Sequence, residues 1–205
     1  MMLNRFLRYI SIPTQSNEDS TSSPTNKNEI KLCSMLADEM RQIGMTTIDR
    51  DVYNGYIYGY IDATPGYEDK PCIGFISHID TAPACCGDNI NPQIIKDYDG
   101  NDIILGDKTL SSKNFPHLAN LVGRTLIVTD GNTLLGADDK AGVAEIMTAM
   151  EELIRSNKPH GKVVVAFTPD EEIGIGTDGF DIDLFGADFA YTVDGGAENI
   201  VESPV

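Results

Sequence analysis

The segment 125–172 constrains the fold most, because it reads as strand, helix and strand. Short apolar runs rich in β-branched residues predict strands at 125–128 and 163–167. Apolar residues at helical spacing between them predict a helix with one buried face: Val143, Ile146, Met147, Met150 and Ile154. Such a segment is expected to form a βαβ unit with parallel strands and a right-handed crossover. The sequence therefore predicts an α/β domain.

Acidic residues follow both of these predicted strands. Asp138 and Asp139 come after the first strand, and Glu171 and Glu172 come after the second. In open α/β sheets, residues just past the carboxyl ends of strands face the ligand crevice. We therefore expect the two acidic pairs at one edge of the sheet.

The charge of the chain restricts its partners. The 205 residues carry a formal net charge of −17, and the sequence pI is about 4.3. This balance argues against binding to nucleic acid or to an anionic membrane. For most of these charges, solubility is a sufficient explanation. Since 41% of the residues are hydrophobic, and no repeat or linker is evident, we expect one globular domain.

The sequence shows no targeting or membrane segment. The apolar residues of 1–10 are interrupted by Arg5 and Arg8, and no run reaches the roughly 20 apolar residues of a membrane span. The four cysteines show no CxxC spacing, which predicts free thiols in a cytoplasmic protein: Cys33, Cys72, Cys85 and Cys86. The vicinal pair among them could also bind a soft metal.

Before the central segment, the sequence predicts two helices and a hairpin. Helical spacing is present in 3–10 and in 30–43, and the second helix starts with a capping box formed by Asn26 and Glu29. Strands are expected at 47–52 and 56–61, joined through an Asn-Gly turn.

A third strand ends in a histidine and an aspartate. The apolar run 72–76 leads directly into His78 and Asp80, which are two residues apart and so project to the same side of a strand. A carboxylate behind an imidazole is a common arrangement in metal sites, because it fixes the tautomer of the ligand. Alone, this pair is weak evidence. His117, in the irregular stretch 82–123, and His160, in a turn, have no such context.

A fourth strand, at 189–193, ends in Asp194. Four strand ends would then present one histidine and several carboxylates, and this oxygen and nitrogen donor set, without thiolate, indicates zinc, manganese or cobalt. Any single carboxylate could instead cap a helix, as Asp138 could before Ala141. Together, however, the carboxylates would repel one another unless a cation neutralised them. Of the adjacent pair, one glutamate could bind metal while the other acts as general base.

Four motifs resemble one known family in order and spacing: HID at 78–80, LLGADDKAG at 134–142, FTPDEE at 167–172 and YTVDGG at 191–196. The chain resembles the tripeptide aminopeptidases among the two-zinc exopeptidases related to aminoacylase. The resemblance implies a three-layer α/β/α sandwich with a mostly parallel central sheet, of which residues 1–205 are the N-terminal part of the catalytic domain. It also implies an enzyme, with a homodimer possible for the complete protein.

The same resemblance implies roles for six residues. Asp138 would bridge two zinc ions, His78 and Asp194 would complete the first ion's ligands, and Glu172 would bind the second ion. Asp80 would orient the histidine. Glu171 would be the general base for hydrolysis of the first peptide bond of a tripeptide. The bond between Asp138 and Asp139 is expected in the cis form.

Relatives in this family are about twice as long. From a point corresponding to Val201 they continue into a lid domain and then the remainder of the catalytic domain, which supplies a last histidine ligand. We expect these parts to be absent from the present sequence, leaving three ligands for the first ion and two for the second.

Three hypotheses therefore stay open. The first is a zinc aminopeptidase for tripeptides. The second is a metal-binding or interaction domain without catalysis, and the third is a related dinuclear deacylase or dipeptidase. Hydrolysis of tripeptides with free N-termini would separate the first from the other two.

Overall fold

The computed structural model describes residues 1–48, 52–196 and 201, and its centre is a five-stranded sheet. The strands lie in the order β1 (Thr46–Ile48), β2 (Ile57–Ile61), β8 (Val163–Thr168), β3 (Ile73–His78) and β9 (Phe189–Thr192). Strands were expected close to all five of these positions. Of the strand expected at 47–52, residues 49–51 lie outside the described residues and Val52 lies in a 3₁₀ turn. The chain is therefore a mixed α/β protein, as the alternation of strands and helices predicts.

The sheet is mixed, so the expected mostly parallel sheet is not confirmed. β1 pairs with β2, and β2 with β8, in antiparallel register. The pairs β8 with β3 and β3 with β9 are parallel. The antiparallel part follows from a short connection between β1 and β2, which includes a 3₁₀ turn at Val52–Asn54 and Gly55 at φ +81°. A short connection returns the chain beside the strand it has just left.

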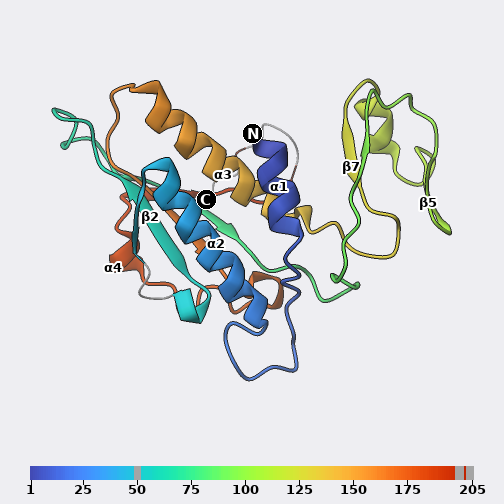
Figure 1. The fold of residues 1–205 in the computed structure, drawn as a ribbon, viewed down its shortest axis with the longest axis horizontal. Coiled ribbons are helices and arrows are strands. Elements are labelled where there is room, and N and C mark those ends of the chain that lie inside the picture. The colour runs from blue at the N-terminus through green and yellow to red at the C-terminus, as the bar shows by residue number, and fades with distance from the viewer. Residues whose placement is uncertain (49–51, 197–200, 202–205) are drawn as a thin grey trace.

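Three helices cover one face of this sheet (Figure 1). They are α1 (Met2–Ile10), α2 (Lys27–Ile43) and α3 (Ala137–Ser156), and the capping box expected at Asn26 and Glu29 is present. Alternate residues of β8, Val163, Val165 and Phe167, join the core beneath these helices. The intervening Val164 and Ala166 belong to a smaller core on the other face, with Tyr58 and with Phe185 of α4 (Ile182–Phe185).

The expected βαβ unit over 125–167 is wrong. β7 (Leu126–Val128) pairs with β4 (Gln93–Ile95) in a separate two-stranded sheet, whereas β8 lies between β2 and β3. β8 is paired over five residues with β2 and over six with β3, so both of its edges are occupied by strands longer than the three-residue β7. The parallel neighbour of β8 is therefore β3, which comes much earlier in the chain.

Residues 93–128, largely expected to be irregular, contain most of a lobe with its own small core (Figure 1). Besides β4 and β7, the lobe holds the hairpin of β5 (Ile103–Leu105) and β6 (Lys108–Leu110), and the 3₁₀ helix η2 (Pro116–Leu121). Buried apolar residues hold these short elements together: Tyr98, Ile103, Leu105 and Leu118.

A buried ion cluster joins the three helices. The guanidinium of Arg5 in α1 donates to Glu39 of α2 at 2.6 Å and to Glu151 of α3 at 2.5 Å. Such pairs fix how helices meet, because leaving one charge buried without its partner is costly. None of the described helices is long and apolar enough to cross a membrane. All four cysteines are free, as the sequence predicts.

Candidate metal centre

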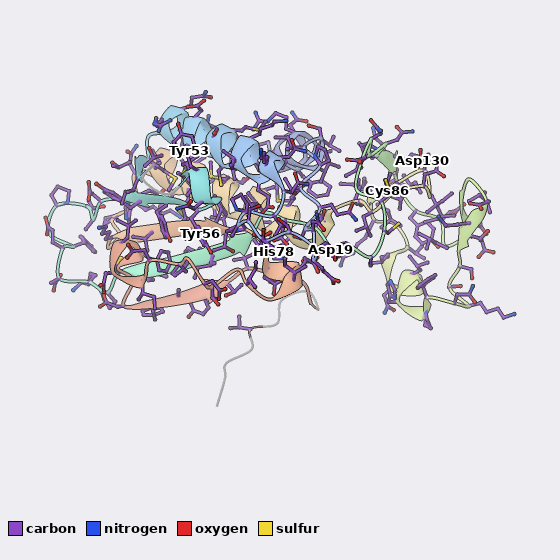
Figure 2. All side chains as sticks on the ribbon, turned by 90° about the horizontal axis from the view of Figure 1, so that it is seen from below. Asp19, Tyr53, Tyr56, His78, Cys86 and Asp130 are labelled. Carbon is purple, nitrogen blue, oxygen red and sulfur yellow. The ribbon has the colours of Figure 1, made fainter. Side chains whose placement is uncertain are left out.

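The site is built around His78, the last residue of β3. Its Nδ1 lies 3.1 Å from Oδ1 of Asp80, and its Nε2 lies 3.0 Å from Oδ1 of Asp138. The predicted contact between the histidine and the aspartate two residues later is therefore present, and both side chains are buried. In the view of Figure 2, His78 lies at the end of the sheet that faces the lobe carrying Cys86 and Asp130.

Asp80 connects the histidine to the turn that follows β8. Its carboxylate accepts hydrogen bonds from the backbone N–H of Glu171 at 3.0 Å and of Glu172 at 3.1 Å, and from the hydroxyl of Ser16. Burial alone would raise the pKa of Asp80, but the hydrogen bonds from His78 and Ser16 outweigh it and lower the pKa. Asp80 is therefore ionised, and its carboxylate holds both His78 and the turn that carries Glu171 and Glu172.

Two groups of side chains could each hold a metal ion. One group is His78, Asp138 and Glu172, and the other is His78, Asp139 and Asp194. Within each group, the donor atoms lie within 4.8 Å of one another. All four residues predicted as metal ligands are thus brought together. Burial would lower the pKa of His78, but contact with Asp80 and the surrounding carboxylates raises it to about 10.

Glu171 and Asp138 face solvent at this site. The side chain of Glu171 is 54% exposed and its Oε2 lies 3.7 Å from Nε2 of His78, while the side chain of Asp138 is 61% exposed. Asp194 is farther, with Oδ1 at 4.0 Å from the same nitrogen. Exposed carboxylates around a buried imidazole leave this side of the site open to a ligand.

Asp138 reaches the site from the start of α3 and not from a strand end in the central sheet. Its backbone angles, φ −81° and ψ 112°, are not helical, and the bond to Asp139 is cis, as expected. The helix-capping role considered for Asp138 belongs to its neighbour, because Oδ1 of Asp139 accepts from the N–H of Gly142 at 3.2 Å.

Asp139 is the acidic residue to which the sequence assigns no role. It is buried, and its carboxylate also accepts from the hydroxyl of Ser77. Burial raises its pKa to about 7. Although its position would allow metal binding, these internal contacts already use both of its oxygens. Its place in the Asp-Asp dipeptide is the only sequence signal that marks it.

The turn before Glu171 is held from behind by Asp170, which the sequence did not single out. Asp170 is fully buried with φ +53°. Its carboxylate accepts from the N–H of Thr25 at 3.1 Å and from the hydroxyl of Ser23 at 3.0 Å. Its own N–H donates to Glu29 at 3.2 Å. The turn is therefore fixed by Asp80 on one side and by the start of α2 on the other.

The buried carboxyl of Glu29 predicts a pH dependence of stability. Burial, with Asp170 and Asp80 nearby, raises the pKa of Glu29 to about 9, whereas an unfolded glutamate titrates near pH 4.3. Between these values the folded state keeps a proton that the unfolded state has lost. The free energy of unfolding should therefore fall as pH rises, by up to about 1.4 kcal/mol per pH unit.

Glu29→Gln removes this titration. Urea unfolding at pH 6, 7, 8 and 9 should show a shallower decline for the variant than for the wild type. Glu18→Gln, at an exposed glutamate, is the matched control and should follow the wild type. If the free energy of unfolding fell equally with pH in Glu29→Gln and the wild type, the raised pKa of Glu29 would not be the cause of the pH dependence.

The other two histidines lie outside the site, as their sequence context suggests. His117 is exposed and packs edge-on against Phe115, and Nδ1 of His160 lies 2.7 Å from the carbonyl oxygen of Gly161. Neither belongs to a group of possible metal ligands among the described residues.

Comparison with known proteins gives a consistent set of relatives. Residues 128–202 match the model of peptidase family M20/M25/M40. The chain is 53% identical to peptidase T of Geobacillus thermodenitrificans and 50% identical to peptidase T of Clostridium acetobutylicum, over 95% of its own length and 48% of theirs. It thus spans about half the length of the curated relatives it matches.

Solved structures agree with this relationship. The aminopeptidase PepT of Bacillus cereus is 26% identical and superposes with a TM-score of 0.67, covering 96% of this chain and 43% of that one. A tripeptidase of Staphylococcus aureus, 24% identical over the same shares, has a TM-score of 0.65 and supports the fold alone.

Proposed function

Because the chain is a homologue of peptidase T and carries a region of peptidase family M20/M25/M40, we propose that it acts in metal-dependent removal of the N-terminal residue from tripeptides. The observation that carries this proposal is the position of His78, with Asp80 at Nδ1 and exposed carboxylates near Nε2. Among possible activities, a metal-assisted hydrolase needs this combination of an oriented imidazole and several acidic ligands.

The donor set fits a borderline divalent cation. Imidazole nitrogen and carboxylate oxygen, without thiolate, are ligands that zinc accepts, and manganese and cobalt bind them too. We propose that His78 and Asp194 would hold a first zinc ion, that Glu172 would hold a second, and that Asp138 would contribute to both. Within this half-length homologue the second ion would have two ligands, and we propose that the rest of the complete protein supplies more.

The residues of this chain then have separate tasks in hydrolysis. A bound divalent cation would polarise the carbonyl of the scissile peptide bond. Glu171, which lies in neither group of possible ligands, takes the proton of the attacking water and passes it to the amine of the leaving peptide. Asp80 holds both His78 and the turn that carries Glu171, so it positions the histidine and the base together.

We propose that the complete protein completes the sheet into the three-layer sandwich expected from the family. Residues 128–202 and the structural superpositions support a catalytic domain of that kind. Free thiols at all four cysteines suit a reducing compartment and so a cytoplasmic protein.

The test combines metal content with substrate choice. The chain is stripped with a chelator, reloaded with zinc, analysed for bound metal, and assayed on trialanine, dialanine and N-acetyl-trialanine. We expect bound zinc and hydrolysis of trialanine alone. Cleavage of the acetylated peptide would indicate a deacylase, and cleavage of dialanine a dipeptidase. Bound zinc without any hydrolysis would indicate a metal-binding domain and contradict the proposed activity of this chain.

A further inference from the structure

A cleft of about 360 Å³ opens directly beside the candidate metal centre. The central sheet forms its floor through Ile76 of β3, Thr168 at the end of β8 and Thr192 of β9. Ile76 is two residues before His78 in β3, so these two side chains lie on the same face of the sheet. A ligand at the metal centre can therefore extend into the cleft without crossing the sheet.

The lining of this cleft is uncharged away from the metal centre. Apart from the metal-centre residues His78, Glu171 and Asp194, its lining consists of apolar, hydroxyl and glycine residues: Ile76, Thr168, Gly174, Gly176, Thr177, Phe180 and Thr192. A charged group placed among these uncharged residues would lose its hydration without an ionic partner beside it, which is costly. The cleft is therefore suited to an uncharged group.

The wall of the cleft is held in place before any ligand binds. Phe180 packs against Tyr58, with ring centroids 5.6 Å apart, and against Phe185 at 5.3 Å. The hydroxyl of Tyr56 donates to the carbonyl of Gly176 and accepts from the N–H of Gly179, both at 3.1 Å. A loop fixed by a buried tyrosine and an aromatic cluster gives a preformed pocket, which reduces the entropy lost on binding.

Close packing also fixes the identity of one wall residue. A Cβ atom at Gly176 would lie 2.8 Å from the carbonyl oxygen of Pro169, a distance that side chains do not tolerate. Glycine at this position therefore lets the loop lie close to the turn that carries Glu171. The cleft and the proposed base are parts of one compact structure.

From these observations we propose that the cleft binds the uncharged side chain of a substrate residue next to the scissile bond, with Thr177 and Phe180 setting the size that is accepted. This inference rests on the proposed function and specifies its substrate class. The volume lies at the lower end for ligand pockets, which is consistent with one side chain and not a whole peptide.

The first experiment measures kcat/KM for two series of tripeptides, X-Gly-Gly and Gly-X-Gly, with alanine, leucine, phenylalanine, aspartate or lysine at X. In one series, leucine and phenylalanine should exceed aspartate and lysine by about tenfold or more. The series that shows this preference identifies whether the residue before or the residue after the scissile bond places its side chain in the cleft. Equal rates for charged and uncharged residues in both series would overturn the inference.

The second experiment narrows the cleft. Thr177 is exposed at its wall, so Thr177→Leu should fold and should lower the ratio of the leucine to the alanine substrate by about tenfold. Thr109→Leu, at an exposed threonine of β6, is the matched control and should leave this ratio and the basal activity unchanged. An unchanged ratio in Thr177→Leu would exclude the cleft as the side-chain pocket.

A binding measurement separates this inference from the proposed function. The sequence contains no tryptophan, so Phe180→Trp introduces a single tryptophan in the cleft wall, and its emission can be excited selectively over the eight tyrosines. Even if no tripeptide is hydrolysed, titration with leucine amide should shift its emission, while aspartate amide and lysine amide at equal concentration should not. An emission that leucine amide does not change would overturn the inference.

Discussion

Replacing Glu171 by glutamine should lower kcat for tripeptide hydrolysis by about 10²- to 10⁴-fold and leave the metal content unchanged. Glutamine has nearly the same shape as glutamate but cannot accept a proton from the attacking water. The side chain of Glu171 is not part of either group of possible metal ligands, and its backbone N–H would still donate to Asp80. The change therefore removes the proposed base and little else.

The measurement pairs steady-state kinetics with elemental analysis of the same preparations. Asp178→Asn, at an exposed aspartate seven residues further along the chain, is the matched control for loss of one negative charge near the site, and it should keep wild-type kcat. An active Glu171→Gln enzyme would assign the base to another residue. Loss of metal in this variant would instead make Glu171 a ligand.

Replacing Asp80 by alanine should weaken metal binding by about 10- to 100-fold and lower activity in parallel. The substitution leaves Nδ1 of His78 without its acceptor and frees the N–H groups of Glu171 and Glu172. The imidazole of His78 and the turn that carries Glu171 and Glu172 would then both lose the carboxylate that holds them in place.

Competition with a fluorescent zinc chelator measures this affinity, and circular dichroism checks that the variant remains folded. Ser16→Ala provides a graded comparison, because it removes a single donor to Asp80 and leaves the contact with His78 in place. We expect its affinity to lie between those of the wild type and Asp80→Ala. Wild-type zinc affinity in Asp80→Ala would show that the carboxylate does not support the histidine.

Much of this site could be predicted because its residues follow local rules. The contact between His78 and Asp80 follows from the two-residue repeat of a strand, and the capping box at Asn26 follows from the spacing of polar residues. These features depend on neighbours in sequence. The approximate positions of the strands in the central sheet were predictable for the same reason.

Two of the features that were missed depend on distant pairing. Which strand lies beside β8 is decided by competition between β2, β3 and β7, and the three-residue β7 pairs with β4 instead. The support of the turn that carries Glu171 by Asp170 depends on Thr25, which is 145 residues away in the chain. No periodic pattern in the sequence marks contacts of this kind.

The hydrogen bonds from Ser23 and Thr25, just before α2, to Asp170 restrict which substitutions the protein can tolerate at these positions. Because the carboxylate of Asp170 is buried among donors from Ser23 and Thr25, a neutral apolar residue at 170 would leave those donors unpaired. Substitutions at 170 and at 25 should therefore be tolerated together more readily than singly. In related sequences these two positions should change as a pair.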